Sequence, residues 1–214
     1  MKLQLALDFP SLAPSLHLLG QVREFFDIVE VGTPLILAEG MRAVTALKRA
    51  AEGLALVADL KIMDAGDLEA RIALDAGADL VTVLALAHEE TIQRVIEAAR
   101  RAGREAMVDL IGVDDPSARL SALTRAGVEL VCCHTAFDRQ GSGERPTAML
   151  SAVRRAAPAM RIAVAGGIEP RRIRELLPFA PEIVIVGGYV ARAPNPHAAA
   201  KALREALEEE ARPT

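Results

Sequence analysis

Short apolar runs alternate with amphipathic stretches along the whole of this 214-residue chain, and this alternation restricts the possible folds more than any other feature. The apolar runs predict strands at Leu3–Leu7, Ile28–Val31, Leu54–Asp59, Leu80–Leu84, Ala106–Leu110, Leu130–Cys133, Ile162–Ala165 and Ile183–Val186. The stretches between them predict helices at Leu12–Phe25, Glu39–Ala51, Leu68–Ala76, Glu89–Ala102, Pro116–Arg125, Thr147–Ala157, Pro170–Leu177 and Pro196–Glu210. Alternating strands and helices are typical of βα units and a parallel sheet. Because there are eight of each, we predict an α/β fold in which residues 1–214 form a single-domain (β/α)8 TIM barrel, rather than an open doubly wound sheet.

Local signals at the helix ends agree with this order of elements. Asp114-Asp115-Pro116 offers an acidic N-cap followed by proline in the first turn of a helix. Glycine follows alanine at Gly77, Gly103 and Gly127, where each predicted helix stops and a strand begins. We therefore expect tight helix-to-strand connections and no second domain.

Composition and charge exclude several classes of protein. The net charge is −4 and the basic residues are scattered, so no nucleic-acid footprint is present. No apolar run approaches the roughly 18 residues that span a bilayer, and the N-terminus lacks the pattern of a signal peptide. Cys132 and Cys133 are adjacent and match no zinc spacing, so we expect reduced, buried thiols. These features predict a cytoplasmic protein with neither a membrane nor a nucleic-acid partner.

Polar residues follow the predicted strands at the point where each strand ends. They are Asp8 after strand one, Glu30 at the end of strand two, Asp59, Lys61 and Asp64 around strand three, Thr82 in strand four, Asp109 in strand five and His134 after strand six. In a barrel the carboxyl ends of all strands meet on one face, where active sites are found. Any one of these residues could belong to a structural network, but together they predict a catalytic site.

Two glycine pairs follow the last two strands, at Gly166-Gly167 and Gly187-Gly188. The loops after strands seven and eight are the recurrent phosphate site of such barrels, because glycine lets backbone N–H groups approach phosphate oxygens closely. Two tight turns are the alternative. Arg192 lies just beyond the second pair and is either a phosphate ligand or a surface residue.

The motif Asp59-Leu60-Lys61-Ile62-Met63-Asp64 resembles the Asp-x-Lys-x-x-Asp signature of the orotidine-monophosphate-decarboxylase superfamily. Further similar stretches span nearly the whole chain in order: KLQLALD, VEVGTPLILAEGMRAV, ADLKIMDAGDLEA, AGADLVTVL, VDLIGVDD, AVAGGI and VIVGG. Within the superfamily the chain is most similar to the 3-hexulose-6-phosphate synthases, whose sister family is the 3-keto-L-gulonate-6-phosphate decarboxylases. The resemblance implies a Mg²⁺-dependent enzyme, with Mn²⁺ as an alternative ion, that adds formaldehyde to D-ribulose 5-phosphate through an enediolate.

The resemblance also implies roles for particular residues. Glu30 and Asp59 would bind the metal ion, and Lys61 would stabilise the enediolate oxygen. Asp64 would reach the active site of a partner subunit, which implies a homodimer. Thr33-Pro34, just beyond Glu30, either shapes the metal-binding loop or forms a plain turn.

Three further side chains are expected to act on the substrate. His134 is the candidate for proton transfer, because a histidine titrates near neutral pH. Asp8 would bind substrate hydroxyl groups or orient Lys61, and Asp109 would hydrogen-bond one end of the substrate.

Departures from the sister families discriminate among the activities. The decarboxylases carry arginine at the position of Phe137 and glutamate at that of Asp109, and both differences favour the synthase. Two other differences do not fit the synthase pattern: the chain has the sequence VLALAHEET after strand four, and it has Tyr189 where a small residue is expected. Glu30 replaces the lysine that orotidine monophosphate decarboxylase needs. A sugar-phosphate decarboxylase remains the alternative enzyme, and a non-catalytic phosphate-binding barrel is the alternative of another class.

Overall fold

Eight parallel strands close into a barrel in the computed structural model, which describes residues 1–142 and 146–209. The strands are β1 (Lys2–Leu7), β2 (Ile28–Val31), β3 (Ala55–Ile62), β4 (Leu80–Leu84), β5 (Glu105–Asp109), β6 (Leu130–His134), β7 (Arg161–Ala165) and β8 (Ile183–Val186). Each strand pairs with the next, and β8 pairs with β1 to complete the ring. The predicted fold class, a single-domain (β/α)8 barrel, is confirmed.

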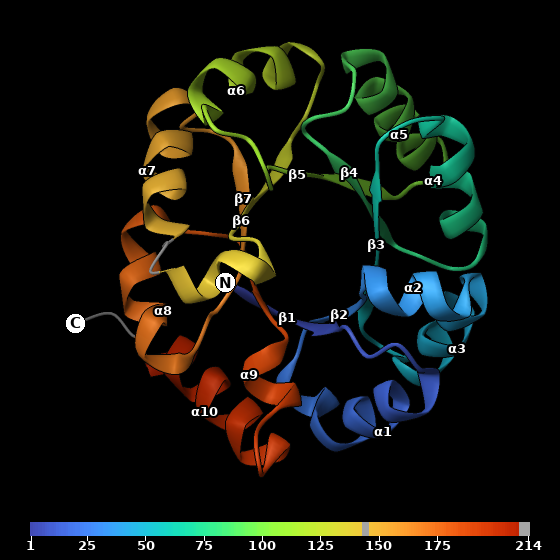
Figure 1. Ribbon diagram of the computed structural model, residues 1–214, viewed down its shortest axis with the longest axis vertical. Coiled ribbons are helices and arrows are strands. Elements are labelled where there is room, and N and C mark those ends of the chain that lie inside the picture. The colour runs from blue at the N-terminus through green and yellow to red at the C-terminus, as the bar shows by residue number, and fades with distance from the viewer. Residues whose placement is uncertain (143–145, 210–214) are drawn as a thin grey trace.

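A ring of helices surrounds the barrel (Figure 1). The α-helices are α1 (Leu12–Val22), α2 (Thr33–Glu39), α3 (Met41–Ala50), α4 (Gly66–Asp75), α5 (Glu89–Arg101), α6 (Pro116–Arg125), α7 (Pro146–Ala156), α8 (Pro170–Leu176), α9 (Gly188–Ala191) and α10 (Pro196–Glu209), and the 3₁₀ turns are η1 (Arg23–Phe25), η2 (Phe137–Ser142) and η3 (Leu177–Phe179). The last helix, α10, packs between α1 and α8 and so closes the ring. No helix in the described part of the chain is long and apolar enough to cross a bilayer.

Three helix predictions need correction. The helix predicted at Glu39–Ala51 is α3, which begins only at Met41, because Glu39 ends a separate helix, α2, that was not predicted. Thr33-Pro34 is therefore the first turn of a helix and not a plain turn, in keeping with the preference of proline for that position. The short helix α9 was not predicted, because four residues are too few to show a helical period. The predicted end of the last helix, residue 210, lies outside the described residues.

Successive residues of each strand point to opposite sides of the barrel wall. One set packs outward against the helices in the main core, which includes Val131 and Cys133 of β6. The other set fills the barrel with small and aliphatic side chains: Ala6, Ile28, Val57, Leu80, Met107, Leu130, Cys132, Ala163, Ala165, Ile183 and Ile185. The two free cysteines are buried, as predicted, but they lie on opposite sides of the wall.

Charged groups at the amino ends of the strands form contacts that stabilise the barrel. Asp27 Oδ2 accepts a hydrogen bond from the Leu3 amide at 2.7 Å, and Asp79 Oδ2 accepts one from the Leu56 amide at 2.8 Å. Arg161 at the start of β7 pairs with Glu182 at 2.6 Å. These contacts belong to the face that stabilises a TIM barrel, so the catalytic candidates are expected at the opposite face.

Candidate active site

The end of β3 departs from regular strand geometry, and this departure positions Lys61. The pairing register between β3 and β4 shifts between Ala58 and Ile62, which marks an irregularity of the bulge type. Lys61 has φ of 48°, in the left-handed region that non-glycine residues seldom adopt. Its backbone N–H is held by Thr82 Oγ1 at 2.9 Å. Strain of this kind is typical of functional sites, where the surroundings fix an unfavourable backbone conformation.

Asp59 is buried and lies at the centre of a hydrogen-bond network. Lys61 Nζ forms an ion pair with its Oδ2, and Thr82 Oγ1 donates to its Oδ1 at 2.8 Å. Thr33 Oγ1 lies 2.8 Å from Oδ2 and 2.7 Å from the Asp59 carbonyl oxygen. Burial raises the pKa of Asp59, but the charge of Lys61 and the three hydrogen-bonding groups outweigh it, so that the pKa lies below its ordinary value.

The same interactions keep Lys61 charged. Burial lowers the pKa of the ammonium group, but the charge of Asp59, with smaller contributions from Asp109 and Glu30, raises it above the ordinary value. Site chemistry near neutral pH therefore takes place beside a fixed positive charge.

Glu30 is buried one residue before the end of β2, in contact with a buried amide. Gln4 Nε2 of β1 donates to Glu30 Oε2, while Gln4 Oε1 is buried without a hydrogen-bond partner among the described residues. Burial, with the charges of Asp59 and Asp8, raises the pKa of Glu30 well above its ordinary value. Three carboxylates thus lie close together and repel one another, with a single lysine among them.

Asp8 follows β1 at the open mouth of the barrel. A Cβ added to Gly32 would lie 2.1 Å from Asp8 Oδ1, and one added to Gly187 would lie 3.2 Å from Oδ2, so the carboxylate fits between two glycine backbones. Surrounding protein atoms remove water from this carboxylate and, together with the charge of Asp59, raise the pKa of Asp8. Asp8 therefore connects the acidic cluster to the loop that carries Gly187.

Asp109 and His134 form a pair on neighbouring strands. His134 Nδ1 lies 2.8 Å from Asp109 Oδ2, and the Ile111 amide donates to Asp109 Oδ1 at 2.9 Å. Asp109 is almost fully buried, whereas about a fifth of the His134 side chain is exposed toward the mouth. An imidazole that donates from Nδ1 keeps Nε2 as a proton acceptor. The expected contact between Asp109 and the substrate stays a prediction, and the geometry gives Asp109 a further part in orienting His134.

The two glycine pairs lie side by side after the neighbouring strands β7 and β8. A Cβ on Gly166, whose φ is 102°, would lie 2.4 Å from the Thr135 carbonyl oxygen. A Cβ on Gly188 would lie 2.5 Å from Nη2 of Arg192, so the guanidinium rests on the glycine backbone and 5.9 Å from the ring centre of Phe137. Gly167 O accepts a hydrogen bond from Arg172 at 3.1 Å. An arginine therefore lies against each glycine pair: Arg172 at Gly167 and Arg192 at Gly188.

Asp64 lies apart from this cluster, on the exposed loop between β3 and α4. Its Oδ1 accepts a hydrogen bond from the Ala65 amide at 2.7 Å. Five large apolar side chains are exposed on α2, on the segment from the end of β3 through α4, and in the β4–α5 loop: Leu37, Met63, Leu68, Ile72 and Leu86. We call these five residues the apolar face.

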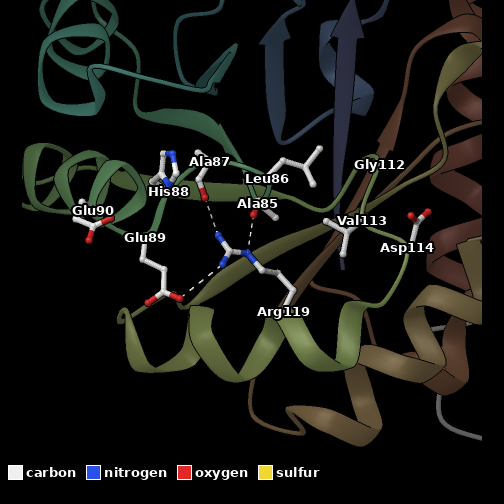
Figure 2. Close-up of a pocket in the computed structure, with 10 residues that line it drawn as sticks. All are labelled: Ala85, Leu86, Ala87, His88, Glu89, Glu90, Gly112, Val113, Asp114 and Arg119. Atoms are coloured by element: carbon white, nitrogen blue, oxygen red, sulfur yellow. Dashed lines mark hydrogen bonds and ion pairs between the residues drawn. The ribbon is translucent and has the colours of Figure 1, made fainter.

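A pocket opens beside the mouth between the β4–α5 and β5–α6 loops. Figure 2 shows Arg119 of α6 reaching the carbonyl oxygens of Ala85 and Ala87, at 2.6 and 2.7 Å, and the carboxylate of Glu89 at 3.7 Å. Arg119 therefore supports the loop that departs from the synthase pattern. His88 lines this pocket and not the barrel interior.

Two residues of the site were not found from the sequence. Gln4 is a polar residue in an otherwise apolar strand and shares the inward face of β1 with Asp8, a spacing that could have revealed it. Thr33 was expected either to shape the metal-binding loop or to lie in a plain turn, and the contact of its hydroxyl with Asp59 was not predicted. The contact depends on the course of α2, which no local pattern specifies.

Comparison with known proteins identifies similar chains over nearly the full length. The model of the family described as "Orotidine 5'-phosphate decarboxylase / HUMPS family" matches residues 1–203. 3-Hexulose-6-phosphate synthase 3 of Staphylococcus saprophyticus is 40% identical over 208 residues, which cover 97% of this chain and 99% of that protein. The crystal structure of 3-hexulose-6-phosphate synthase from Salmonella typhimurium shares 39% identity and a TM-score of 0.95 over 98% of this chain and 99% of that chain. The 3-keto-L-gulonate-6-phosphate decarboxylase from Vibrio cholerae shares 30% identity and a TM-score of 0.87 over 97% of each chain.

Proposed function

Because the chain belongs to the orotidine 5'-phosphate decarboxylase / HUMPS family, we propose that it catalyses the Mg²⁺-dependent aldol addition of formaldehyde to D-ribulose 5-phosphate, and its reverse. The predicted enzyme class, an aldehyde-lyase, is confirmed by full-length relatives named 3-hexulose-6-phosphate synthase. The observation that carries the finer proposal is the arrangement of Lys61, the Asp109–His134 pair and the glycine loops around one mouth. We expect this chemistry to take place in the cytoplasm.

The donor set fits a magnesium ion. Glu30 and Asp59 offer oxygen ligands, and Mg²⁺ prefers one or two carboxylates plus water or substrate oxygens. Burial, and after it repulsion by Asp59 and Asp8, raises the pKa of Glu30, and a divalent cation would relieve the repulsion. When bound, magnesium would offset negative charge that develops on the substrate oxygens.

In the proposed reaction, the proton transfers are carried out by His134. His134, held by Asp109, accepts the proton from C1 of ribulose 5-phosphate, and the electron pair left behind forms the enediolate. The ammonium group of Lys61 stabilises the charge on the enediolate oxygen. The enediolate carbon then attacks formaldehyde, and His134 returns the proton to the new alkoxide. Asp8, at the mouth, receives substrate hydroxyl groups.

The phosphate group of the substrate fits the opposite side of the mouth. Backbone N–H groups of Gly166, Gly167, Gly187 and Gly188 would bind its oxygens, with Arg192 as the nearby cation. Tyr189 and Phe137 are exposed near these loops, and the Phe137 ring lies beside the Arg192 guanidinium.

A direct assay tests the activity. Purified protein with Mg²⁺ should consume formaldehyde and ribulose 5-phosphate in equal amounts. The alternative, decarboxylation of 3-keto-L-gulonate 6-phosphate, is favoured if formaldehyde remains while that substrate releases CO₂. Binding of ribulose 5-phosphate without turnover of either substrate would instead indicate a phosphate-binding barrel.

Replacement of Glu30 by glutamine should weaken metal binding. The substitution keeps the shape of a side chain that is buried against Gln4, but removes one of two charged ligands. We expect Mg²⁺ affinity, measured by calorimetry, to fall about 10- to 100-fold or more, because mutations even of the residues that only orient metal ligands lower metal affinity on this scale. Glu52→Gln, a change outside the site, is the control. Wild-type Mg²⁺ affinity in Glu30→Gln would show that Glu30 is not a ligand.

We also propose that the chain forms a homodimer through the apolar face, so that Asp64 reaches the partner's site. Exposed apolar patches of this kind mark protein–protein contacts, and Met63 lies directly beside Asp64. Ile72→Arg in α4 should convert the dimer to a monomer in analytical ultracentrifugation and lower activity with it, because the site loses Asp64 of the other copy. Arg94→Glu on α5 is a surface control that reverses a charge outside this face. A dimeric Ile72→Arg variant would place the interface elsewhere.

A further inference from the structure

Three side chains of β5 and β6 bring a carboxylate, a thiol and an imidazole together below the mouth. Asp109 and Cys132 are register partners on the two strands, and His134 follows Cys132 on the same inward face. Ligand atoms from all three lie within 4.8 Å of one another. The proposed aldol reaction uses Asp109 and His134 but gives no part to Cys132.

We propose that Asp109, Cys132 and His134 form a second metal site that binds Zn²⁺ and thereby inhibits the enzyme. Zinc sites with three protein ligands and one open position are built from these ligand types, and tetrahedral zinc holds its ligand atoms roughly 3 to 4 Å apart. The present spacing therefore needs to contract by about 1 Å. His134 is the partly exposed member, so an ion enters from the mouth past its ring and its open position faces the substrate.

The chemistry of the ligands separates this site from the proposed magnesium site. Thiolate and imidazole ligands select Zn²⁺, whereas a site made only of carboxylate oxygens suits Mg²⁺. Glu30 and Asp59 supply oxygen alone, while Cys132 and His134 supply sulfur and nitrogen. Excess Mg²⁺ is therefore expected to leave the zinc site accessible.

Binding exchanges protons in a defined way. Burial, with the charges of Asp109, Cys133 and Glu30, raises the pKa of Cys132, so its thiol carries a proton before the ion arrives. Coordination releases that proton to water, and the thiolate and carboxylate together balance the two charges of zinc. If Nε2 of His134 binds zinc it is blocked as an acceptor, and if Nδ1 binds, its proton moves to Nε2. In both cases His134 can no longer accept a proton from the substrate.

Calorimetry of Zn²⁺ binding to the Mg²⁺-saturated protein tests the site. We expect one Zn²⁺ per chain and the release of about one proton, seen as a dependence of the heat on the buffer. Cys132→Ser should lower the affinity at least about tenfold, equivalent to 1.4 kcal/mol. Cys133→Ser is the matched control, because that thiol lies in the outer core on the other side of the wall. Wild-type Zn²⁺ affinity in Cys132→Ser, or displacement of Zn²⁺ by Mg²⁺, would overturn the proposal.

Two further measurements test the zinc site even if Cys132→Ser fails to fold or the proposed reaction is wrong. Cobalt(II) bound to Cys133→Ser protein should show thiolate-to-cobalt charge-transfer absorption, and its absence overturns the proposal even if Cys132→Ser fails to fold. In the formaldehyde assay, Zn²⁺ should inhibit wild type and Cys133→Ser but spare Cys132→Ser. Because the calorimetric and spectroscopic experiments measure the metal and not turnover, their results do not depend on the proposed reaction.

Discussion

Replacement of Lys61 by methionine is expected to lower kcat about 1,000-fold, because it removes the cation that we propose to stabilise the enediolate charge. Lys61 Nζ forms an ion pair with Asp59, lies 3.2 Å from Thr33 Oγ1, and stays protonated because acidic groups raise its pKa. A loss of this size corresponds to about 4 kcal/mol of transition-state stabilisation. Steady-state rates of formaldehyde consumption at saturating ribulose 5-phosphate measure it.

The controls for Lys61 separate catalysis from folding. Removal of the ammonium leaves Asp59 buried without its counter-ion, so Lys61→Met should also melt at a lower temperature. Lys61→Arg keeps a positive charge beside Asp59, and should melt near the wild-type temperature while the larger guanidinium fails to reach the enediolate oxygen. Lys201→Met, at an exposed site on α10, should match wild type in both measurements. Activity of Lys61→Met within tenfold of wild type would refute the electrostatic role.

Replacement of His134 by asparagine should lower kcat about 100- to 10,000-fold, the usual contribution of a positioned general base. The asparagine amide can still donate to Asp109, so the buried carboxylate keeps a partner and the fold should survive. Because we assign substrate binding to the glycine loops and the acidic cluster, we expect KM to change little. Exchange of the C1 proton of ribulose 5-phosphate with deuterated water, followed by NMR, isolates the step that His134 performs.

Asp109→Asn tests whether the carboxylate orients the imidazole. The new amide would donate to Nδ1 and place the imidazole proton on Nε2, which removes the acceptor without removing the ring. We expect C1 proton exchange to slow in this variant as well, with the fold intact. His17→Asn, at an exposed position on α1 hydrogen-bonded to Gln21, is the control for both variants.

If the C1 proton of ribulose 5-phosphate exchanges at the wild-type rate in His134→Asn, the proton transfer belongs to another group.

Much of the barrel could be predicted because its determinants are local. All eight strands were predicted within a few residues, since each is a short apolar run bounded by polar or glycine residues. The helix N-cap at Asp115 was predicted from Asp-Pro, and its Oδ1 accepts from the Ser117 amide at 2.9 Å. Helix α2 was missed, because its seven residues are too few to show a clear helical period.

The arrangement of the site could be predicted only in part. The sequence places Asp59, Lys61, Asp109 and His134 at strand ends, and barrel closure then brings those ends to one face. It does not reveal which of them touch. The bulge at the end of β3, the hydroxyl of Thr33 from α2 and the buried amide of Gln4 all act on side chains from other elements.

The sequence by itself determined the order of the elements, the face on which the polar residues gather and the family to which they belong, because apolar periodicity and short motifs are local properties of the chain. Only the tertiary structure decided that Lys61 pairs with Asp59, that Asp109 holds His134, and that Cys132 lies beneath them while Cys133 faces outward. These contacts join residues of different strands, or depend on the side of the barrel wall to which a side chain points. Strand register and closure of the barrel determine which strands meet and which side chains point inward.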